Sequence, residues 1–308
     1  MVTLSQTARG HLAMLSFSAL VAGSFSLGSM IANDIAPSAL NAARYLIATV
    51  LLGAYLIIFG PRVRREHLVA PWRYLLLGGI FAIYFVLMFE GLKTAPAVST
   101  SAVFTLTPLM AAGFGFLLLS QISGARILAA LVIGGAGAVW VIFRADMSAL
   151  LAFEIGRGEA IFFVGCIAHA LFTPLLKRLN RGEPALVSTA LVMAGCFLTL
   201  VVFGLPEIIA TDWRALSPMV WVALAYLALA ASATTTFLLQ YAALRLPSAK
   251  VMAYTYLTPS WVICWEFVLG RGLPPALVLP GLGLTVIALL LLLKSDAPDE
   301  PRIAPLRA

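Results

Sequence analysis

Ten apolar runs, each about as long as a bilayer-spanning helix, follow one another through this chain and limit what it can fold into. The core of a membrane offers the backbone no hydrogen bonds, so only helices or a closed barrel can cross it. The runs are near-continuous rather than alternating, which excludes barrel strands and predicts an all-α integral membrane protein. We expect transmembrane helices at 11–32, 37–59, 72–92, 97–119, 126–144, 158–177, 184–204, 218–241, 248–269 and 275–294.

Composition supports this fold class. The chain is 62% hydrophobic and 11% charged, with a mean hydropathy of +1.01, whereas soluble domains are about half apolar and about a quarter charged. The net charge of +7 does not indicate a nucleic-acid partner, because the basic residues lie mainly in short loops between spans. The three cysteines lie in apolar runs without metal-ligand spacing, so we expect no disulfide, metal or other cofactor.

The distribution of basic residues predicts the orientation. Fourteen of the 20 Lys and Arg residues fall in the even-numbered connections and at the two ends, against five in the odd-numbered connections. The excess places both termini in the cytoplasm of a bacterium, with the chain crossing the inner membrane many times. Residues 9–32 are expected to remain as the first helix rather than to be a cleaved signal peptide. The polar, proline-rich residues 295–308 are expected to form a disordered cytoplasmic tail.

One pattern occurs twice. Residues 92–120 and 244–270 each contain a tight turn and then a helix with a proline in its middle. The dipeptides Thr107-Pro108 and Thr258-Pro259 are 151 residues apart, as are the turn prolines of the two copies. Five spans per half is an odd number, so the second half starts on the opposite side of the membrane. We therefore expect an inverted repeat of 10–146 and 156–294, an architecture used by transporters.

Three sequence stretches resemble a known family. They are APSALNAARYLIA, with Pro37 and Arg44; the junction FEGLKTAPAVSTSAVFTLTPL; and its second copy LQYAALRLPSAKVMAYTYLTPS. Over residues 10–294 the chain resembles the EamA family of the drug/metabolite transporter superfamily, which implies export or exchange of small organic solutes. Its aromatic hairpins are most similar to those of YddG-type aromatic amino-acid exporters. Family members often carry Glu where this chain has Gln121 and Gly272, so no role is carried over for that Glu.

Span nine carries a stripe of aromatic and polar side chains. Lys250, Tyr254, Thr258, Trp261 and Trp265 follow helical spacing and would share one face. Such a face could stack on a ring and hydrogen-bond an amine or carboxylate. We take Tyr254, Thr258 and Trp261 as substrate-binding candidates. Contact with lipid or the membrane interface is the alternative for both Trp residues, and is weighed equally for Trp265.

Span four is the equivalent helix of the first half, and its binding candidates are Thr100 and Phe104. Pro108 and Pro259 each remove a backbone hydrogen bond and leave a carbonyl free. Where backbone faces a cavity, such groups can coordinate a solute or allow a helix to bend for gating. The alternative is a kink that only improves packing.

Four of the ionisable residues within the apolar runs are candidates for a role in coupling or as a buried charge. His169 is a candidate for solute binding and for proton coupling, with a neutral histidine bridging two helices as the alternative. Glu266 is expected to face the bundle and to have a partner. A solvated place at a helix end is favoured for Glu90. For Arg44 we favour a structural role, with its side chain reaching the outer surface or pairing with a carboxylate.

Spans one, three and eight supply the remaining solute-binding candidates, which are Ser24, Tyr84, Met88 and Thr235. For the small residues among these candidates, close packing between helices is an equal alternative to solute binding. The glycines of spans five and ten indicate a scaffold or a homodimer surface rather than a pathway.

These observations favour a secondary transporter that exports or exchanges small organic metabolites by alternating access, with aromatic amino acids as the leading candidates. Efflux of drugs or cations by the same fold is the alternative. An intramembrane enzyme is disfavoured, because the chain contains no HExxH or GxSxG pattern and no aspartate within a span. A non-transporting scaffold would not need the repeated proline-broken hairpin. There is no Walker A pattern, so ATP-driven pumping by this chain alone is not expected.

Overall fold

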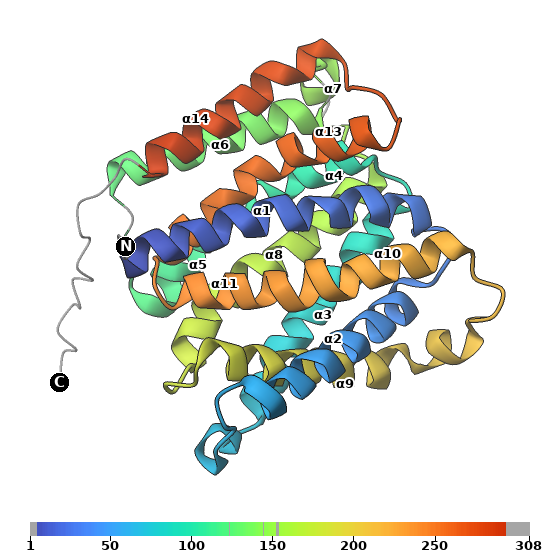
Figure 1. The fold of residues 1–308 in the computed structure, drawn as a ribbon. Helices are drawn as coiled ribbons and strands as arrows, with labels where there is room; N and C mark the ends of the chain where they lie inside the picture. Colours follow the sequence, from blue (N-terminus) through green and yellow to red (C-terminus); the bar gives the residue numbers. More distant parts are fainter. Residues whose placement is uncertain (1–4, 123, 144, 152–153, 294–308) are drawn as a thin grey trace.

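The computed structural model describes residues 5–122, 124–143, 145–151 and 154–293, and these residues contain helices and loops but no strand (Figure 1). The tail 295–308 lies outside the described residues. Nine helical segments of the described part are long and apolar enough to cross a membrane. They are α1 Gln6–Ile31, α2 Pro37–Phe59, α3 Trp72–Leu92, the α4–α5 segment Ala97–Leu119, α6 Ala125–Ile142, α8 Arg157–Leu179, α9 Ala185–Ala210, the α10–α11 segment Pro218–Ala243 and the η4–α14 segment Ala276–Leu293.

The span expected at 248–269 is not among the nine, and it consists of three short pieces. These are α12 Ser248–Ala253, the 3-10 turn η3 Tyr254–Leu257 and α13 Thr258–Val268, which follow one another without a gap. Two further short helices, η1 Arg65–Leu68 and α7 Met147–Leu151, lie in connections. The all-α membrane fold is confirmed, and the count of ten spans stays a prediction.

The two helices that carry Pro108 and Pro259, spans four and nine, are interrupted at matching places. The first consists of α4 Ala97–Phe104 and α5 Thr107–Leu119, with a turn between them. Pro108 and Pro259 each lie in the first turn of the helix after the interruption, where the missing N–H costs least. The two interruptions meet, since Thr107 Oγ1 lies 3.2 Å from Thr255 Oγ1. The α5 helix packs against α12, and α4 packs against α13.

The freed carbonyl is satisfied in both copies, so neither proline leaves a carbonyl open to a solute. Pro108 frees the carbonyl of Phe104, which accepts a 2.7 Å hydrogen bond from the Thr107 hydroxyl. Pro259 frees the carbonyl of Thr255, which accepts from the backbone N–H of Thr258. The second copy uses its 3-10 turn for this, and the hydroxyl of Thr258 is left without a partner among the described residues.

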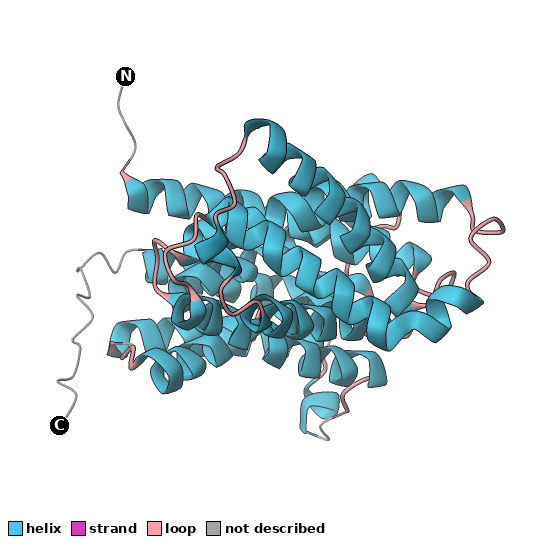
Figure 2. Cartoon of the chain, turned by 90° about the horizontal axis from the view of Figure 1, so that it is seen from below, coloured by secondary structure: helices cyan, strands magenta, loops and turns pink. Residues whose placement is uncertain are grey.

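The helices run side by side between two ends where the loops gather (Figures 1 and 2). The α1 helix begins and α14 ends at the same end, on the left of Figure 1. Helices α6 and α14 pair along one edge of the bundle, and α2 and α9 pair along the opposite edge. The use of α6 and α14, the fifth and tenth spans, as a homodimer surface stays a prediction.

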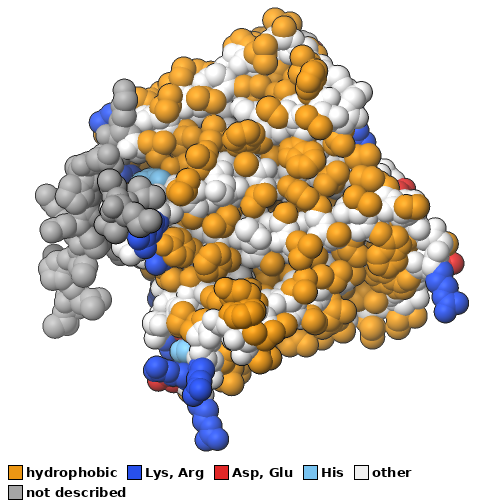
Figure 3. Space-filling view, viewed as in Figure 1, with side chains coloured by type: hydrophobic (Ala, Val, Ile, Leu, Met, Phe, Trp, Pro, Cys, Tyr) orange, Lys and Arg blue, Asp and Glu red, His pale blue; other side chains and the backbone are white. Residues whose placement is uncertain are grey.

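The outer surface is apolar between the two ends. Orange hydrophobic side chains cover the face seen in Figure 3, while the blue Lys and Arg side chains gather at its two ends. Large apolar side chains project outward from the helices, such as Ile57 at 88% exposure and Phe203 at 82%. A soluble protein cannot leave a belt of this kind in water, whereas lipid tails cover it. The chain is a multi-pass membrane protein.

Candidate solute site

Aromatic side chains from four helices form a closed cluster in the middle of the bundle, which we call the aromatic cage. Its rings belong to Phe25 of α1, Phe81 and Tyr84 of α3, Phe104 of α4, and Phe162 and His169 of α8. All of these side chains are buried. The His169 ring lies 4.4 Å from the Tyr84 ring and 5.0 Å from the Phe104 ring, between centroids. Phe25 lies 5.8 Å from both Phe104 and Phe162.

Local sequence explains why these rings converge. Phe81, Tyr84 and Met88 follow one another at helical spacing and share a face of α3. Phe162 and His169 are two turns apart and share a face of α8. The α3 and α8 helices pack along each other, and Gly91 and Gly158 allow the close approach. Both helices therefore turn their ring-bearing faces toward the same space.

Several polar atoms of the site are buried without a partner. The hydroxyl of Tyr84, Nδ1 of His169 and the hydroxyl of Ser24 have no hydrogen-bond partner among the described residues. Buried polar groups are normally paired. Tyr84 and His169 belong to the cage, so these two groups leave this apolar site with unused hydrogen-bonding capacity. That combination suits a ligand with an apolar body and a few polar groups.

The structure brings together three of the residues proposed from sequence. Tyr84, Phe104 and His169 are members of the cage, Ser24 precedes Phe25 on α1, and Met88 is one turn beyond Tyr84 on α3. Sequence reasoning missed Phe25 and Phe81. Their signal was available, because each lies on a helix next to, or one turn from, a candidate residue.

Other proposed residues are used differently. The Thr100 hydroxyl donates to the carbonyl of Pro96, and the Thr235 hydroxyl donates to that of Ala231, so both are bound to their own helices. Tyr254 lies at one end of the bundle, where its hydroxyl is 3.0 Å from Nδ1 of His11.

The stripe expected on span nine does not stay on one face. Thr258 is fully buried, Trp261 is 37% exposed on the outside of α13, and the Trp265 ring packs 5.5 Å from that of Tyr226. The 3-10 turn η3 winds the chain more tightly than an α-helix and so rotates α13 relative to α12. Trp261 lies in the same helix as Thr258, and its exposure places it on the outside of the bundle, the position that was the alternative for it.

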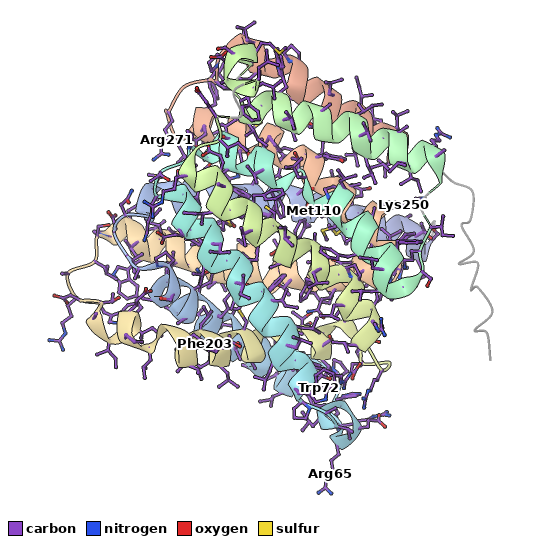
Figure 4. The ribbon with its side chains drawn as sticks, turned by 180° about the vertical axis from the view of Figure 1, so that it is seen from behind. Arg65, Trp72, Met110, Phe203, Lys250 and Arg271 are labelled. Carbon is purple, nitrogen blue, oxygen red and sulfur yellow. The ribbon has the colours of Figure 1, made fainter. Side chains whose placement is uncertain are left out.

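The two acids singled out within the apolar runs form ion pairs near the ends of helices. Glu90 pairs with Lys93 at 2.6 Å and is about one-third exposed, and Glu266 lies 3.6 Å from Arg271. Figure 4 places Arg271 at one end of the bundle, and Trp72 and Lys250 at the other. Neither acid belongs to the cage.

Arg44 is buried beside the cage. Its Nη2 donates to the carbonyl of Ala231 at 2.6 Å and its Nε donates to the hydroxyl of Ser232. Both acceptors belong to η2 Leu229–Thr234, a π-helical turn between α10 Pro218–Ala228 and α11 Thr235–Ala243. The guanidinium also lies 4.0 Å from the centroid of the Phe85 ring. Arg44 does not reach the outer surface, and it forms no ion pair with a described residue, contrary to the two placements expected for it.

Two similar contacts join the halves at opposite ends. In the first, Gly158 packs against Thr94 and Ala95, and Glu159 accepts a 2.7 Å hydrogen bond from the Ser99 hydroxyl. We call this the Glu159 contact. In the second, Gly10 packs against Arg245 and Leu246, and His11 pairs with the Tyr254 hydroxyl. We call this the His11 contact.

The two contacts match in sequence. Gly10 and His11 correspond to Gly158 and Glu159 in the repeat, and Arg245 and Leu246 correspond to Thr94 and Ala95. In each contact the first helix of one half meets the turn before the broken helix of the other half.

The two contacts lie at opposite ends of the bundle, because each lies near a different end of α8. The Lys177 ammonium, near the end of α8, donates to the carbonyl of Leu246, which touches Gly10. Glu159 begins the same helix and lies about 27 Å away, at about 1.5 Å per residue. The cage lies between the two contacts, because Phe162 and His169 come from the α8 residues between Glu159 and Lys177.

Comparison with known proteins is consistent with this architecture. A family model described as the EamA-like transporter family matches residues 8–143 and again residues 156–294. An uncharacterized transporter of Bacillus subtilis (strain 168), YyaM, is 25% identical over 222 residues, which cover 71% of this chain and 72% of YyaM. A solved crystal structure shares the fold, with a TM-score of 0.68 over 91% of this chain and 95% of its own, at 19% identity. The narrower resemblance to YddG-type exporters stays a prediction. Because the family model matches both halves, the chain belongs to the EamA-like transporter family and is a membrane transporter.

Proposed function

We propose that this protein is a secondary transporter that exports or exchanges small organic metabolites across the cytoplasmic membrane by alternating access. The observation that supports this mechanism is the pair of matching contacts at opposite ends, with the aromatic cage between them. With both contacts formed, the cage is closed at each end. Separation of one contact while the other stays formed would open the cage to one side only, as alternating access requires.

Aromatic amino acids are the favoured solutes. The cage offers ring faces for stacking, and the free polar groups of Tyr84 and His169 offer hydrogen bonds to polar substituents. A cation could also bind aromatic faces, so efflux of cationic drugs is the second candidate. The two candidate classes of solute differ in charge. Solutes of the same shape but different charge can therefore distinguish them.

The first experiment measures transport and the two contacts together. Labelled phenylalanine and tryptophan are offered to proteoliposomes that contain a Cys264→Ser background, because Cys264 is the exposed cysteine and Cys166 and Cys196 are buried. Cysteine pairs replace Ser99 and Glu159, or His11 and Tyr254. A short, reducible bifunctional thiosulfonate reagent joins each pair. We expect either cross-link to stop uptake, and a reductant to restore it.

The controls decide what a loss of uptake means. Each single cysteine treated with the same reagent should keep its uptake. A cross-link at one end should also raise the labelling of a cysteine at the other end by an impermeant maleimide. Wild-type uptake with either pair cross-linked would refute alternating access through these contacts. Addition of a pH gradient to the same assay tests proton coupling: a response lost in His169→Gln but kept in Glu266→Gln would assign coupling to His169.

A further inference from the structure

Arg44 is a buried cation with neutral surroundings. Its side chain is fully buried, and its three nitrogens have one hydrogen bond each, to Ser232, Ala231 and, at 3.5 Å, Asn41. A guanidinium has five N–H donors, so two remain unused. Among the described residues, no carboxylate forms an ion pair with it, although Arg73, the other fully buried arginine, has Glu183 at 2.8 Å. An uncompensated buried charge is costly and calls for an anion.

Further donors surround the same position. Phe85 lies between three groups: its ring is 4.0 Å from the Arg44 guanidinium, 5.6 Å from the Tyr45 ring and 4.6 Å from the Tyr84 ring. The hydroxyls of Tyr45 and Tyr84 are both buried without a partner among the described residues. A full positive charge and two unused hydroxyls make a region rich in donors and poor in acceptors. The complementary chemical group is one with acceptors and a negative charge, such as a carboxylate.

This region is continuous with the aromatic cage. Tyr84 contacts Phe85 on one side and His169, at 4.4 Å, on the other. A ligand that placed a carboxylate toward Arg44 and Tyr84 would therefore place the rest of its body among the rings of the cage.

We propose that Arg44 is the anion-binding group of the solute site and selects solutes that carry a carboxylate on a ring-bearing or apolar body. This inference rests on the proposed transport function and narrows its substrate class to aromatic carboxylates, whether anionic or zwitterionic. Cationic drugs are excluded as the main solutes, because an ammonium in the cage would meet an unpaired guanidinium in a medium of low dielectric constant.

The test uses three solutes with the same phenyl ring and two-carbon chain. They are 3-phenylpropanoate, which is an anion; phenylalanine, a zwitterion; and phenethylamine, a cation. Binding to purified protein is measured by calorimetry, and uptake is measured in proteoliposomes. We expect the wild type to bind the two carboxylates at least tenfold more tightly than phenethylamine. Arg44→Gln should lose this preference, with phenethylamine binding unchanged or tighter.

Two variants separate recognition of the anion from support of the fold. Ser232→Ala removes a neutral partner of Arg44 but keeps the charge, so the preference for carboxylates should remain. Arg44→Lys keeps the charge without the planar fork and should give an intermediate preference. If Arg44→Gln does not fold, Tyr84→Phe removes one donor and no charge, and it should weaken the carboxylates relative to phenethylamine.

The other outcomes are decisive as well. An equal loss for all three solutes in Arg44→Gln would make Arg44 a structural residue and refute the inference. A wild-type preference for phenethylamine would also refute it and would favour cation efflux. An unchanged preference in Arg44→Gln would show that Arg44 is not the anion-binding group, while the transport proposal would still stand. If the wild type neither binds nor transports any of the three, the substrate assignment and the anion-binding role both fail.

Discussion

The two fully buried arginines of this chain have contrasting surroundings. Arg73 has an acid partner, since its Nη2 lies 2.8 Å from Glu183 Oε1, and both side chains are buried. Tyr74 adds a 3.0 Å hydrogen bond to the same carboxylate, and the backbone N–H of Arg181 donates to its other oxygen. Arg44 has none of this support. The Arg73–Glu183 ion pair therefore stabilises one end of the bundle, whereas the charge of Arg44 remains available to a ligand.

The Glu183 carboxyl should make stability depend on pH. Burial alone would raise its pKa, but the hydrogen bonds from Arg181, Arg73 and Tyr74 hold the pKa below the ordinary value. A carboxyl with a lowered pKa contributes stability that is present above its unfolded pKa, about 4.3, and is lost as the pH falls through the folded value. We expect Tm in detergent to fall below about pH 4.3, and Glu183→Gln to remove this part of the dependence.

The same variant should be unstable at neutral pH. Glu183→Gln leaves Arg73 buried without its counter-charge, which typically costs about 3–5 kcal/mol. Glu66→Gln is the matched control in the same region, because Glu66 is exposed and pairs with Arg64 at the surface. That pair should contribute at most about 1 kcal/mol. Equal Tm values for the two variants across the pH range would contradict this role of Glu183.

At the scale of residues, the sequence could identify candidate residues, but it could identify fewer of the groups that they contact. Phe104 could be chosen because it lies in the duplicated proline hairpin, and His169 because ionisable groups within apolar runs are unusual. The partners of Arg44 could not be foreseen, because they depend on a π-helical turn more than 180 residues away in the chain. The exposure of Trp261 was likewise hidden, since helical spacing does not show which face of a helix points out of the bundle.

At the scale of elements, glycines set how closely helices pack. A β-carbon at Gly78 of α3 would collide with the backbone of Gly195 and Cys196 of α9, whereas one at Gly79 would have only Thr199 nearby, at 3.8 Å. We expect Gly78→Ala to destabilise by about 1–3 kcal/mol, because α3 and α9 must separate. Gly79→Ala should instead be neutral or stabilising by up to about 1 kcal/mol, since Ala favours a helix.

Thermal unfolding of the two variants in detergent checks this contrast. The substitution is identical, and the positions are adjacent on one helix, so propensity and expression cannot account for a difference of opposite sign. Equal Tm values would show that α3 and α9 are packed less closely at Gly78 than the structure indicates.

Sequence could predict most of the elements. The apolar runs located the helices to within a few residues, because length and hydropathy are local properties, and proline chemistry marked where two of them are interrupted. The form of each interruption remained hidden. The first copy has a short turn, and the second has the 3-10 turn η3, although both carry a Thr-Pro dipeptide. Local sequence patterns do not contain that difference.

At the scale of the molecule, the repeat in sequence has a counterpart in contacts. Matching motifs 151 residues apart indicated two related halves. They did not indicate that the first helix of each half would contact the other half at one end of the bundle. The Glu159 and His11 contacts appear only when the chain is folded, because they join residues 60 and 243 positions apart. Their likeness suggests that the same small movement, made at either end, could open the cage.

Orientation in the membrane can be inferred from which end carries the basic residues. The His11 end holds Arg73, Lys177 and Arg245, all bonded to groups near that end. The start of α1 and the end of α14 lie there too (Figure 1). Because positively charged loops stay in the cytoplasm, we expect the His11 end to face inward and the Glu159 end to face outward.

Two single-cysteine variants of the Cys264→Ser background test this orientation in cells. Arg65 lies in the exposed connection before α3, at the His11 end, as Figure 4 shows, and Arg214 lies in the exposed connection after α9, at the other end. An impermeant maleimide should label Arg214→Cys in intact cells, but Arg65→Cys only after the membrane is permeabilised. The reverse pattern would invert the assignment of both contacts, because the Glu159 contact would then close the cytoplasmic side. Labelling of both variants in intact cells would contradict a membrane-spanning arrangement between these two ends.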